Sequence, residues 1–354
     1  MKKTLVAVAA LAASAAFAQS SVTLYGVADA YFGSEKLDGV TSQTVVNSGG
    51  LSQSRIGLSV KEDLGSGLSA FAIIEGNVAL DQGAGATANR KSIVGLSGGF
   101  GAVSLGQQQT PMQDVLENVI DAQGNSGFST VNASIAGNVA ASGATLFTYG
   151  NSVRYDSPNF DGFSGAVQIG LGENKNQAVG ATSNSADRGV SLNVKYENGP
   201  LGVVFAYQND KATTDGVAAS VAPPTPAVPG TKVDTKITAL GGYYDFGVAK
   251  LNLGYVNGKA TVTDLALATT GSAKGRTINV GVTVPVDAFT FVGQYSQAEI
   301  NDVAGNSKSF ALEGRYALSK RTTAYAGYNN TKENIGGGAD TKTNRFGVGV
   351  RHVF

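Results

Sequence analysis

The sequence predicts an all-β protein: a 16-stranded antiparallel transmembrane β-barrel whose long third loop folds into its interior. Three observations predict this fold. The chain ends on an alternating strand, its apolar leader is too short to cross a membrane as a helix, and its alternating segments are joined by tight turns at one end and long loops at the other. That asymmetry of turns and loops is typical of barrels that cross a membrane with strands.

The last eleven residues, 344–354, form the clearest strand of the chain. One face of it is apolar and the other is charged or carries glycine, and a period of two with two such faces is a half-buried strand. The apolar face holds Phe346, Val348, Val350 and Phe354, and the other face holds Arg345, Gly347, Gly349 and Arg351.

Residues 1–18 have the features of a secretory leader. Lys2 and Lys3 precede an apolar run from Leu5, and an Ala-Phe-Ala triplet at 16–18 provides a small-x-small cleavage site. The apolar run is shorter than the ~20 residues that a membrane-spanning helix needs. We therefore expect the mature chain to begin at Gln19 and to form one domain over residues 19–354, crossing the membrane as strands.

Composition excludes several classes of protein. Removing the leader takes away two lysines, which leaves 24 Lys+Arg against 26 Asp+Glu, so a nucleic-acid partner is not expected. The chain has no cysteine, which excludes a disulfide framework and a thiolate metal site. We expect no cofactor and no metal. With 48 glycines and 28 Tyr+Phe, the chain has neither the composition of a disordered segment nor that of a helical membrane protein.

Short Gly/Pro/Asp segments place the strand connections. Seven tight turns join sixteen strands, and 336 mature residues give 21 per strand, enough for a tilted span of about 9 to 11 residues plus connections. Both termini then lie on the periplasmic side. The segment 234–246 is ambiguous in register and is placed by its turn alone. The seven turns are 62–67, 98–101, 158–162, 198–200, 245–247, 285–287 and 318–320.

Aromatic residues recur at strand positions. They fit girdles at the lipid headgroups, although ordinary β-propensity of Tyr and Phe explains the same pattern. Those that we assign to the girdles are Tyr25, Tyr155, Tyr207, Phe291, Tyr295, Phe310, Tyr316 and Tyr325.

The third external connection, 108–150, is far longer than a usual hairpin loop, and loops of that length are normally functional or disordered. Within it, 110–121 opens with Thr-Pro, a cap and first-turn pair. Apolar residues then recur at helical spacing, which predicts a short helix. They are Met112, Val115, Leu116 and Val119.

A sixteen-stranded barrel is too wide to be filled by side chains, so its interior holds water and depends on what narrows it. If the third loop folds inward, its acidic residues Asp114, Glu117 and Asp121 lie at the constriction. Arg55, Arg90 and Arg154 occupy strand positions that can face them. The alternative for each arginine alone is a lumen charge paired with a neighbouring acid and without influence on transport. Scattered charges in the same inward register are assigned to the vestibules: Lys61, Glu75, Lys195 and Arg315.

Opposed carboxylates and guanidinium groups create a transverse field in a narrow pore. Neutralising all three arginines is expected to shift ion preference towards cations. The sign of the native preference stays open at this stage.

Several short motifs are spread along the mature chain, which ends on Phe354: 21–26 (SVTLYG), 54–57 (SRIG), 62–65 (EDLG), 94–101 (VGLSGGFG), 105–107 (LGQ) and 151–158 (NSVRYDSP). Through these motifs and its ending, the whole mature chain resembles the Gram-negative general porins of the beta-proteobacterial type. The resemblance implies a homotrimer of sixteen-stranded barrels in the outer membrane, in contact with lipid and lipopolysaccharide, passing small hydrophilic solutes and ions. It also implies assembly through the C-terminal strand, with Phe354 as the signal for the barrel-assembly machinery. The third loop lacks the Pro-Glu-Phe-Gly-Gly turn of the enterobacterial branch, and Gln107 replaces a usual basic residue.

An enzyme is not expected, because His352 is the only histidine and no nucleophile has a recognisable base partner. Two other interpretations stay open beside a general diffusion channel: a surface adhesin or antigen on a barrel scaffold, and a substrate-specific channel. The third loop distinguishes a channel from an adhesin, since a channel needs it inside the barrel and an adhesin needs it outside.

Overall fold

The computed structural model describes residues 20–85, 87–131, 147–172, 188–214, 220–221, 224–225, 230–264, 267, 269–301, 305–335 and 338–354. The expected leader, 1–18, and the expected start of the mature chain at Gln19 lie outside this range. No helix in the described part of the chain is long and apolar enough to cross a membrane.

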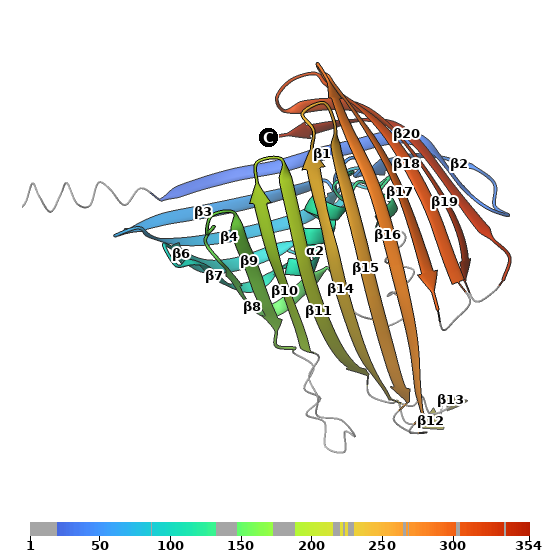
Figure 1. Cartoon of the computed structure of the whole chain (residues 1–354), viewed down its shortest axis with the longest axis horizontal. Helices are drawn as coiled ribbons and strands as arrows, with labels where there is room; N and C mark the ends of the chain where they lie inside the picture. The colour runs from blue at the N-terminus through green and yellow to red at the C-terminus, as the bar shows by residue number, and fades with distance from the viewer. Residues whose placement is uncertain are drawn as a thin grey trace, which may run out of the picture.

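The described strands form a closed antiparallel barrel (Figure 1). Its sheet has eighteen strands. Two of them, β2 and β3, pair one after the other with β1 and form a single strand of the wall, and β5 adds only a two-residue pairing with β4. The wall therefore has sixteen strands. Pairing of β1 with β20 closes it, from Val27 opposite Val353 to Leu37 opposite Thr343. The predicted fold class is confirmed.

The strand bounds follow the chain order. The wall strands are β1 (Ser21–Leu37), β2 (Gln43–Ser48) with β3 (Arg55–Gly65), β4 (Leu68–Ala79), β6 (Lys91–Gly98), β7 (Gly101–Gln109), β8 (Thr148–Asp156), β9 (Phe163–Gly170), β10 (Arg188–Asn198), β11 (Leu201–Thr214), β14 (Thr231–Asp245), β15 (Lys250–Asp264), β16 (Thr270–Val286), β17 (Phe289–Ile300), β18 (Gly305–Ala317), β19 (Thr322–Ile335) and β20 (Thr341–Val353). The minor strands are β5 (Ala84–Gly85), β12 (Ser220–Val221) and β13 (Pro224–Thr225).

All seven predicted turns connect neighbouring strands. Four of them leave only two residues between paired positions: Gly65 to Leu68, Gly98 to Gly101, Asn198 to Leu201 and Val286 to Phe289. Asp287, at the β16–β17 turn, has a φ of 50°, a left-handed conformation that Asp tolerates better than most residues. β1 begins and β20 ends at the barrel end that carries these turns, since Ser21 pairs with Lys61 beside the β3–β4 turn and Val353 pairs with Val27.

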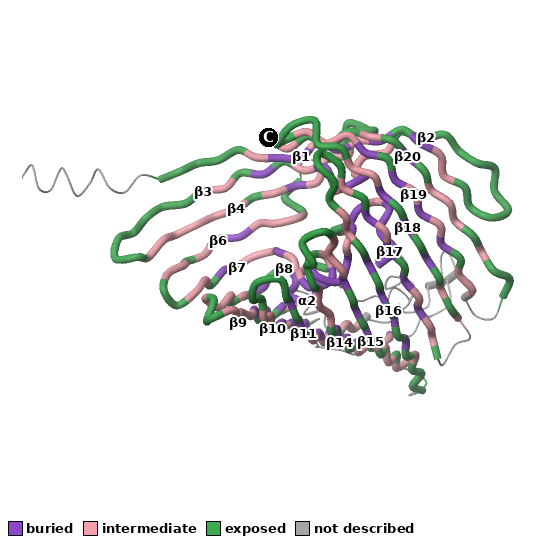
Figure 2. The backbone as a smooth tube through the Cα atoms, turned by 45° about the horizontal axis from the view of Figure 1, so that its top comes forward, coloured by how far each residue is buried: buried purple, intermediate pink, exposed green. Residues whose placement is uncertain are grey.

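Inward and outward residues alternate along the strands (Figure 2). In β16, Thr277 and Asn279 face inward and are almost fully buried, whereas Ile278 and Val280 face outward with 51% and 39% of their surface exposed. Apolar side chains therefore cover the outside, which suits acyl chains. In strands such as β16, polar side chains line the inside, which suits water.

Two expectations need correction or completion. Tyr25 and Tyr325 do not belong to the aromatic girdles, because both point inward and donate hydrogen bonds, to Glu75 at 2.9 Å and to Asp29 at 2.5 Å. The register of 234–246 was unreadable because β14 is apolar on both faces: Ile237 and Ala239 are buried inside the barrel, and Leu240 is exposed outside. A period of two disappears when both faces are apolar.

Candidate pore constriction

The third loop begins with the predicted helix. It consists of an α-helical part, α2 (Pro111–Val115), continued by the π-helical turn η1 (Leu116–Ile120). Thr110 caps it: its hydroxyl accepts a hydrogen bond from the Gln113 amide at 3.2 Å. Pro111 takes the first helical position, where a missing N–H costs no helix bond.

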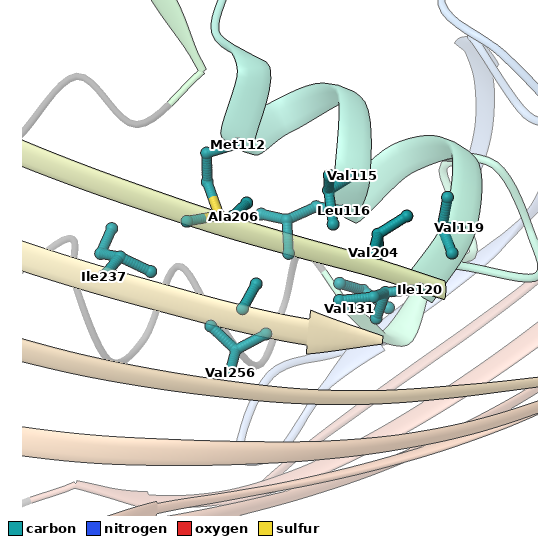
Figure 3. Packing of buried hydrophobic residues seen from close by; sticks show 11 residues of the cluster. Met112, Val115, Leu116, Val119, Ile120, Val131, Val204, Ala206, Ile237 and Val256 are labelled. Atoms are coloured by element: carbon teal, nitrogen blue, oxygen red, sulfur yellow. The ribbon is translucent and has the colours of Figure 1, made fainter. Parts of the chain in front are cut away.

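The apolar side of this helix packs onto the inner wall of the barrel (Figure 3). Met112, Val115 and Ile120 are fully buried. Their partners are inward residues of β11, β14 and β15: Val204, Ala206, Ile237, Ala239 and Val256. The described first part of the loop, up to residue 131, therefore lies inside the barrel and covers one side of its lumen, as a channel requires and an adhesin does not.

The opposite wall carries two of the three expected arginines around a shared carboxylate. Glu75 on β4 binds Arg90 Nε at 2.7 Å, and Arg55 Nε on β3 stands 3.7 Å from it. The Tyr25 hydroxyl donates to the same carboxylate at 2.9 Å. Gln53 bridges the two guanidinium groups, because Arg55 donates to its carbonyl and Arg90 to its side-chain oxygen. Each arginine thus has a fixed position on the lumen wall.

A polar cavity of about 540 Å³ separates this wall from the loop. Glu117 lines it from the loop side, where Gln109 Nε2 donates to its carboxylate at 2.9 Å. Arg55, Arg90 and Lys91 line it from the wall. The structure therefore brings Arg55, Arg90 and Glu117 to one water-accessible gap. Charges of opposite sign across such a gap produce a field transverse to the pore.

Arg154 has a different environment. Its guanidinium binds Asp114 of α2 at 2.7 Å and Asp156 of its own strand at 2.7 Å, and it donates to the Gln109 carbonyl at 3.0 Å. Arg154 and Asp114 thus join the start of the loop to β8, and do not face each other across water. For Arg154 the geometry fits the alternative interpretation of a lumen charge paired with acidic neighbours.

Asp121 departs from its expected place at the gap. It is 4% exposed, and its carboxylate accepts hydrogen bonds from the amides of Gln123 and Asn125 and from the Ser129 hydroxyl, all within 2.9 Å. Burial raises the pKa of this carboxyl, and the hydrogen bonds oppose that rise. The helix ends one residue before it, so its side chain turns into the loop and organises the segment that follows.

The residues assigned to the vestibules divide into three groups. Glu75 was misplaced, since it lies at the centre of the arginine pair. Arg315 binds Glu313 beside it and donates to the Gln123 carbonyl at 3.1 Å, so it holds the far part of the third loop. Lys61 and Lys195 lie nearer the turn end, in the inward register of Arg55 and Asn193.

The C-terminal residue has a definite role in closure. The Phe354 amide donates to the Gly26 carbonyl at 3.1 Å, and the Gly26 amide donates to the Phe354 carbonyl at 3.0 Å. The ring lies against Gly26, where a Cβ would come within 2.3 Å of it. Phe354 therefore completes the seam between the first and last strands.

Sequence reasoning missed two contributors to the constriction. Gln53 and Asn77 both bind Arg90, and neither carries a charge that would have drawn attention. The apolar inner patch of β11, β14 and β15 was also missed. Its signal was present in the sequence as strands that are apolar on both faces, next to a loop helix that is apolar on one.

A closed barrel that holds a folded loop and still leaves a gap lined by polar and charged side chains defines the class of this protein, a diffusion channel. The chain also matches the family model described as Gram-negative porin over residues 4–336. It is 32% identical to outer membrane porin protein 32 of Delftia acidovorans over 375 residues, and 30% identical to an outer membrane porin protein of Bordetella pertussis over 405, in both cases along the full length of both chains.

Among solved structures, an anion-selective porin from Comamonas acidovorans superposes with a TM-score of 0.78 at 27% identity, covering 95% of this chain and 100% of that one. The chain belongs to the Gram-negative porin family. It is accordingly a diffusion channel of the outer membrane. These findings do not favour the adhesin or the substrate-specific channel.

Proposed function

We propose that this channel passes small hydrophilic solutes and ions with a preference for anions, and that the preference is set at the gap between Arg55, Arg90 and Glu117. One observation carries the proposal. The cavity at the constriction is lined by three cations, Arg55, Arg90 and Lys91, against two carboxylates, one of which is already bound by Arg90. The similar porin from Comamonas acidovorans is described as anion-selective, which supports the same sign.

Arginine suits this position because its guanidinium stays charged even when other cations crowd it. An anion entering the gap finds two guanidinium groups held at fixed positions: Arg90 by Glu75, Gln53 and Asn77, and Arg55 by Glu75 and the Gln53 carbonyl. It needs no rearrangement of the wall to be attracted. Glu117 on the opposite side repels the anion towards the arginines and orients dipolar solutes along the transverse field. Passage, and not catalysis, is the work that this arrangement supports.

The experiment is a reversal-potential measurement across a planar bilayer with a salt gradient. Wild-type protein is expected to show the sign of anion preference. The double variant Arg55→Gln/Arg90→Gln is expected to move the reversal potential towards that of a cation-selective channel. An unchanged reversal potential in the double variant would contradict the proposed site, and a cation-selective wild type would contradict the proposed sign.

We propose further that three copies form a homotrimer surrounded by outer-membrane lipid and lipopolysaccharide, and that the C-terminal strand ending on Phe354 is recognised by the barrel-assembly machinery. The apolar outer face of the barrel supports contact with lipid or with a second subunit. Cross-linking of detergent-purified protein tests the trimer: a ladder ending at three subunits is expected, and a monomer alone would contradict it.

A further inference from the structure

Four inward-facing glycines of the wall lie directly beneath side chains of the third loop. Gly241 and Gly254 are paired in register on β14 and β15, and both face Ile120. Gly281 on β16 faces Ala122, and Gly327 on β19 faces Phe128. All three loop residues thus rest where a wall side chain would otherwise be.

The approach is closer than any other residue would allow. A Cβ on Gly254 would lie 2.3 Å from Ile120 Cγ2, and one on Gly241 would lie 2.6 Å from Ile120 Cγ1. A Cβ on Gly281 would lie 2.5 Å from the Ala122 Cβ, and one on Gly327 would lie 2.5 Å from the Phe128 ring. Carbon atoms at van der Waals contact are about 3.5 to 4.0 Å apart, so even a methyl group at these positions would move the loop.

An amide side chain stands beside the glycines and binds the loop main chain at the same place. Asn252, two residues before Gly254, donates to the Val119 carbonyl at 2.7 Å. Gln294, opposite Gly281 across the ladder, accepts from the Ala122 amide at 2.8 Å. Asn329, two residues after Gly327, donates to the Phe128 carbonyl at 3.0 Å. The glycines determine how closely the loop approaches the wall, and the amide side chains determine the position of the loop along the strands.

Together these contacts follow the loop from 119 to 128 across β14, β15, β16, β17 and β19. We propose that these glycine–amide pairs are positioning residues of the channel: they set the distance between the third loop and the wall behind it, and thereby the width of the gap in front. This inference rests on the proposed function, since it takes the gap lined by Glu117 to be the narrowest part of the conducting path.

The test begins with Gly254→Ala, whose added methyl group pushes Ile120 and the helix towards the arginines. Single-channel conductance in a planar bilayer is expected to fall. Adding Ile120→Ala removes Cγ1 and Cγ2, the atoms that the new methyl group meets first, and is expected to restore the conductance. Ile120→Val retains both γ carbons, so the double variant Gly254→Ala/Ile120→Val is expected to stay low.

Gly314→Ala is the matched control, because this glycine faces outward and its Cβ would lie 3.8 Å from the nearest atom, on the Phe291 ring. Its conductance should equal that of the wild type. A second pair keeps the test decisive if Gly254→Ala does not assemble: Gly281→Ala is expected to lower the conductance, and Gly281→Ala with Ala122→Gly to restore it.

Unchanged conductance in Gly254→Ala and Gly281→Ala would overturn the inference, as would a loss that Ile120→Val reverses as fully as Ile120→Ala does. Failure of the proposed function would appear in a different measurement, as an unchanged reversal potential in Arg55→Gln/Arg90→Gln or as a cation-selective wild type.

Discussion

At the scale of single residues, the three wall arginines differ by their partners and not by their type. Arg55 and Arg90 share the single Glu75 carboxylate and line the polar gap, so they contribute net positive charge there. Arg154 binds both Asp114 and Asp156, whose two negative charges more than offset its single positive charge locally. Position in sequence alone could not separate them, because the pairing depends on where the loop returns to the wall.

The substitution Arg154→Gln is therefore expected to change the reversal potential less than Arg90→Gln does. It removes one end of an ion pair to the loop, so larger current fluctuations are expected as the start of the helix loosens. Bilayer recordings of the two single variants, taken in the same salt gradient, measure both quantities. A larger selectivity shift for Arg154→Gln would show that its charge reaches the ion path.

The Asp29 carboxylate of the wall is shared by four hydrogen-bond donors. It is fully buried, and it accepts hydrogen bonds from the amides of Gly50, Leu51 and Ser52 and from the Tyr325 hydroxyl. It thereby holds the irregular segment between β2 and β3, whose Gly50 carbonyl accepts from the Gly127 amide of the third loop at 2.7 Å.

Replacing Asp29 by Asn leaves one acceptor oxygen for four donors. We expect a loss of about 2 to 4 kcal/mol in the free energy of unfolding, since buried donors without partners cost about 1 to 3 kcal/mol. Urea denaturation of the refolded protein in detergent measures it. Asp63→Asn is the matched control and should change stability little, because this carboxylate lies at an exposed turn and accepts from the Gly65 amide. Equal losses in both variants would contradict the assigned role.

At the scale of elements, the helix at the start of the third loop could be predicted from the sequence, whereas the course of the chain after the helix could not. Thr110, Pro111 and the apolar spacing indicated the helix, and the structure has it. The direction of Asp121 was not readable, because it depends on the helix ending at Ile120 and on donors from Gln123, Asn125 and Ser129 further along.

Glu117 and Asp121 are consequently expected to differ in effect. Glu117→Gln removes a charge from the gap and should strengthen anion preference, whereas Asp121→Asn should leave the reversal potential nearly unchanged because that carboxylate is enclosed by the loop. Reversal potentials of the two variants compare them directly. Equal shifts would mean that Asp121 also acts on the ion path.

The strands show the same difference between features set by local sequence and features set by contacts distant in sequence. The turns were predictable, because Gly, Pro and Asp favour the backbone conformations that tight turns require. All seven predicted turns are present in the structure. The inward apolar patch on β11, β14 and β15 obscured the register of β14. The pattern of one polar and one apolar face fails where the lumen is covered by protein, as it is beneath Met112 and Ile120.

At the scale of the whole molecule, closure depends on the seam between β1 and β20. Phe354 adds two main-chain hydrogen bonds with Gly26 beyond the last ladder pair, Val27 with Val353. The seam is also the end of the chain that we propose the assembly machinery recognises. Closure of the seam and recognition by the assembly machinery can be separated experimentally, because closure is a property of the folded barrel and recognition takes place only in the cell.

Deleting Phe354 is expected to reduce the amount of barrel in the outer membrane severely while refolding from urea into detergent suffers less. Heat-modifiable mobility on gels reports the folded fraction in both settings. An equal loss in the cell and in detergent would mean that Phe354 acts through the stability of the seam alone.

Selectivity and conductance both depend on ions passing through a gap bordered by the third loop inside the barrel. The chain has no cysteine, so a single Glu117→Cys substitution gives one reactive group. A bulky methanethiosulfonate reagent added during single-channel recording is expected to reduce the current in steps, while Leu240→Cys on the lipid face should not respond. Full current through a channel labelled at position 117 would contradict this path for the ions.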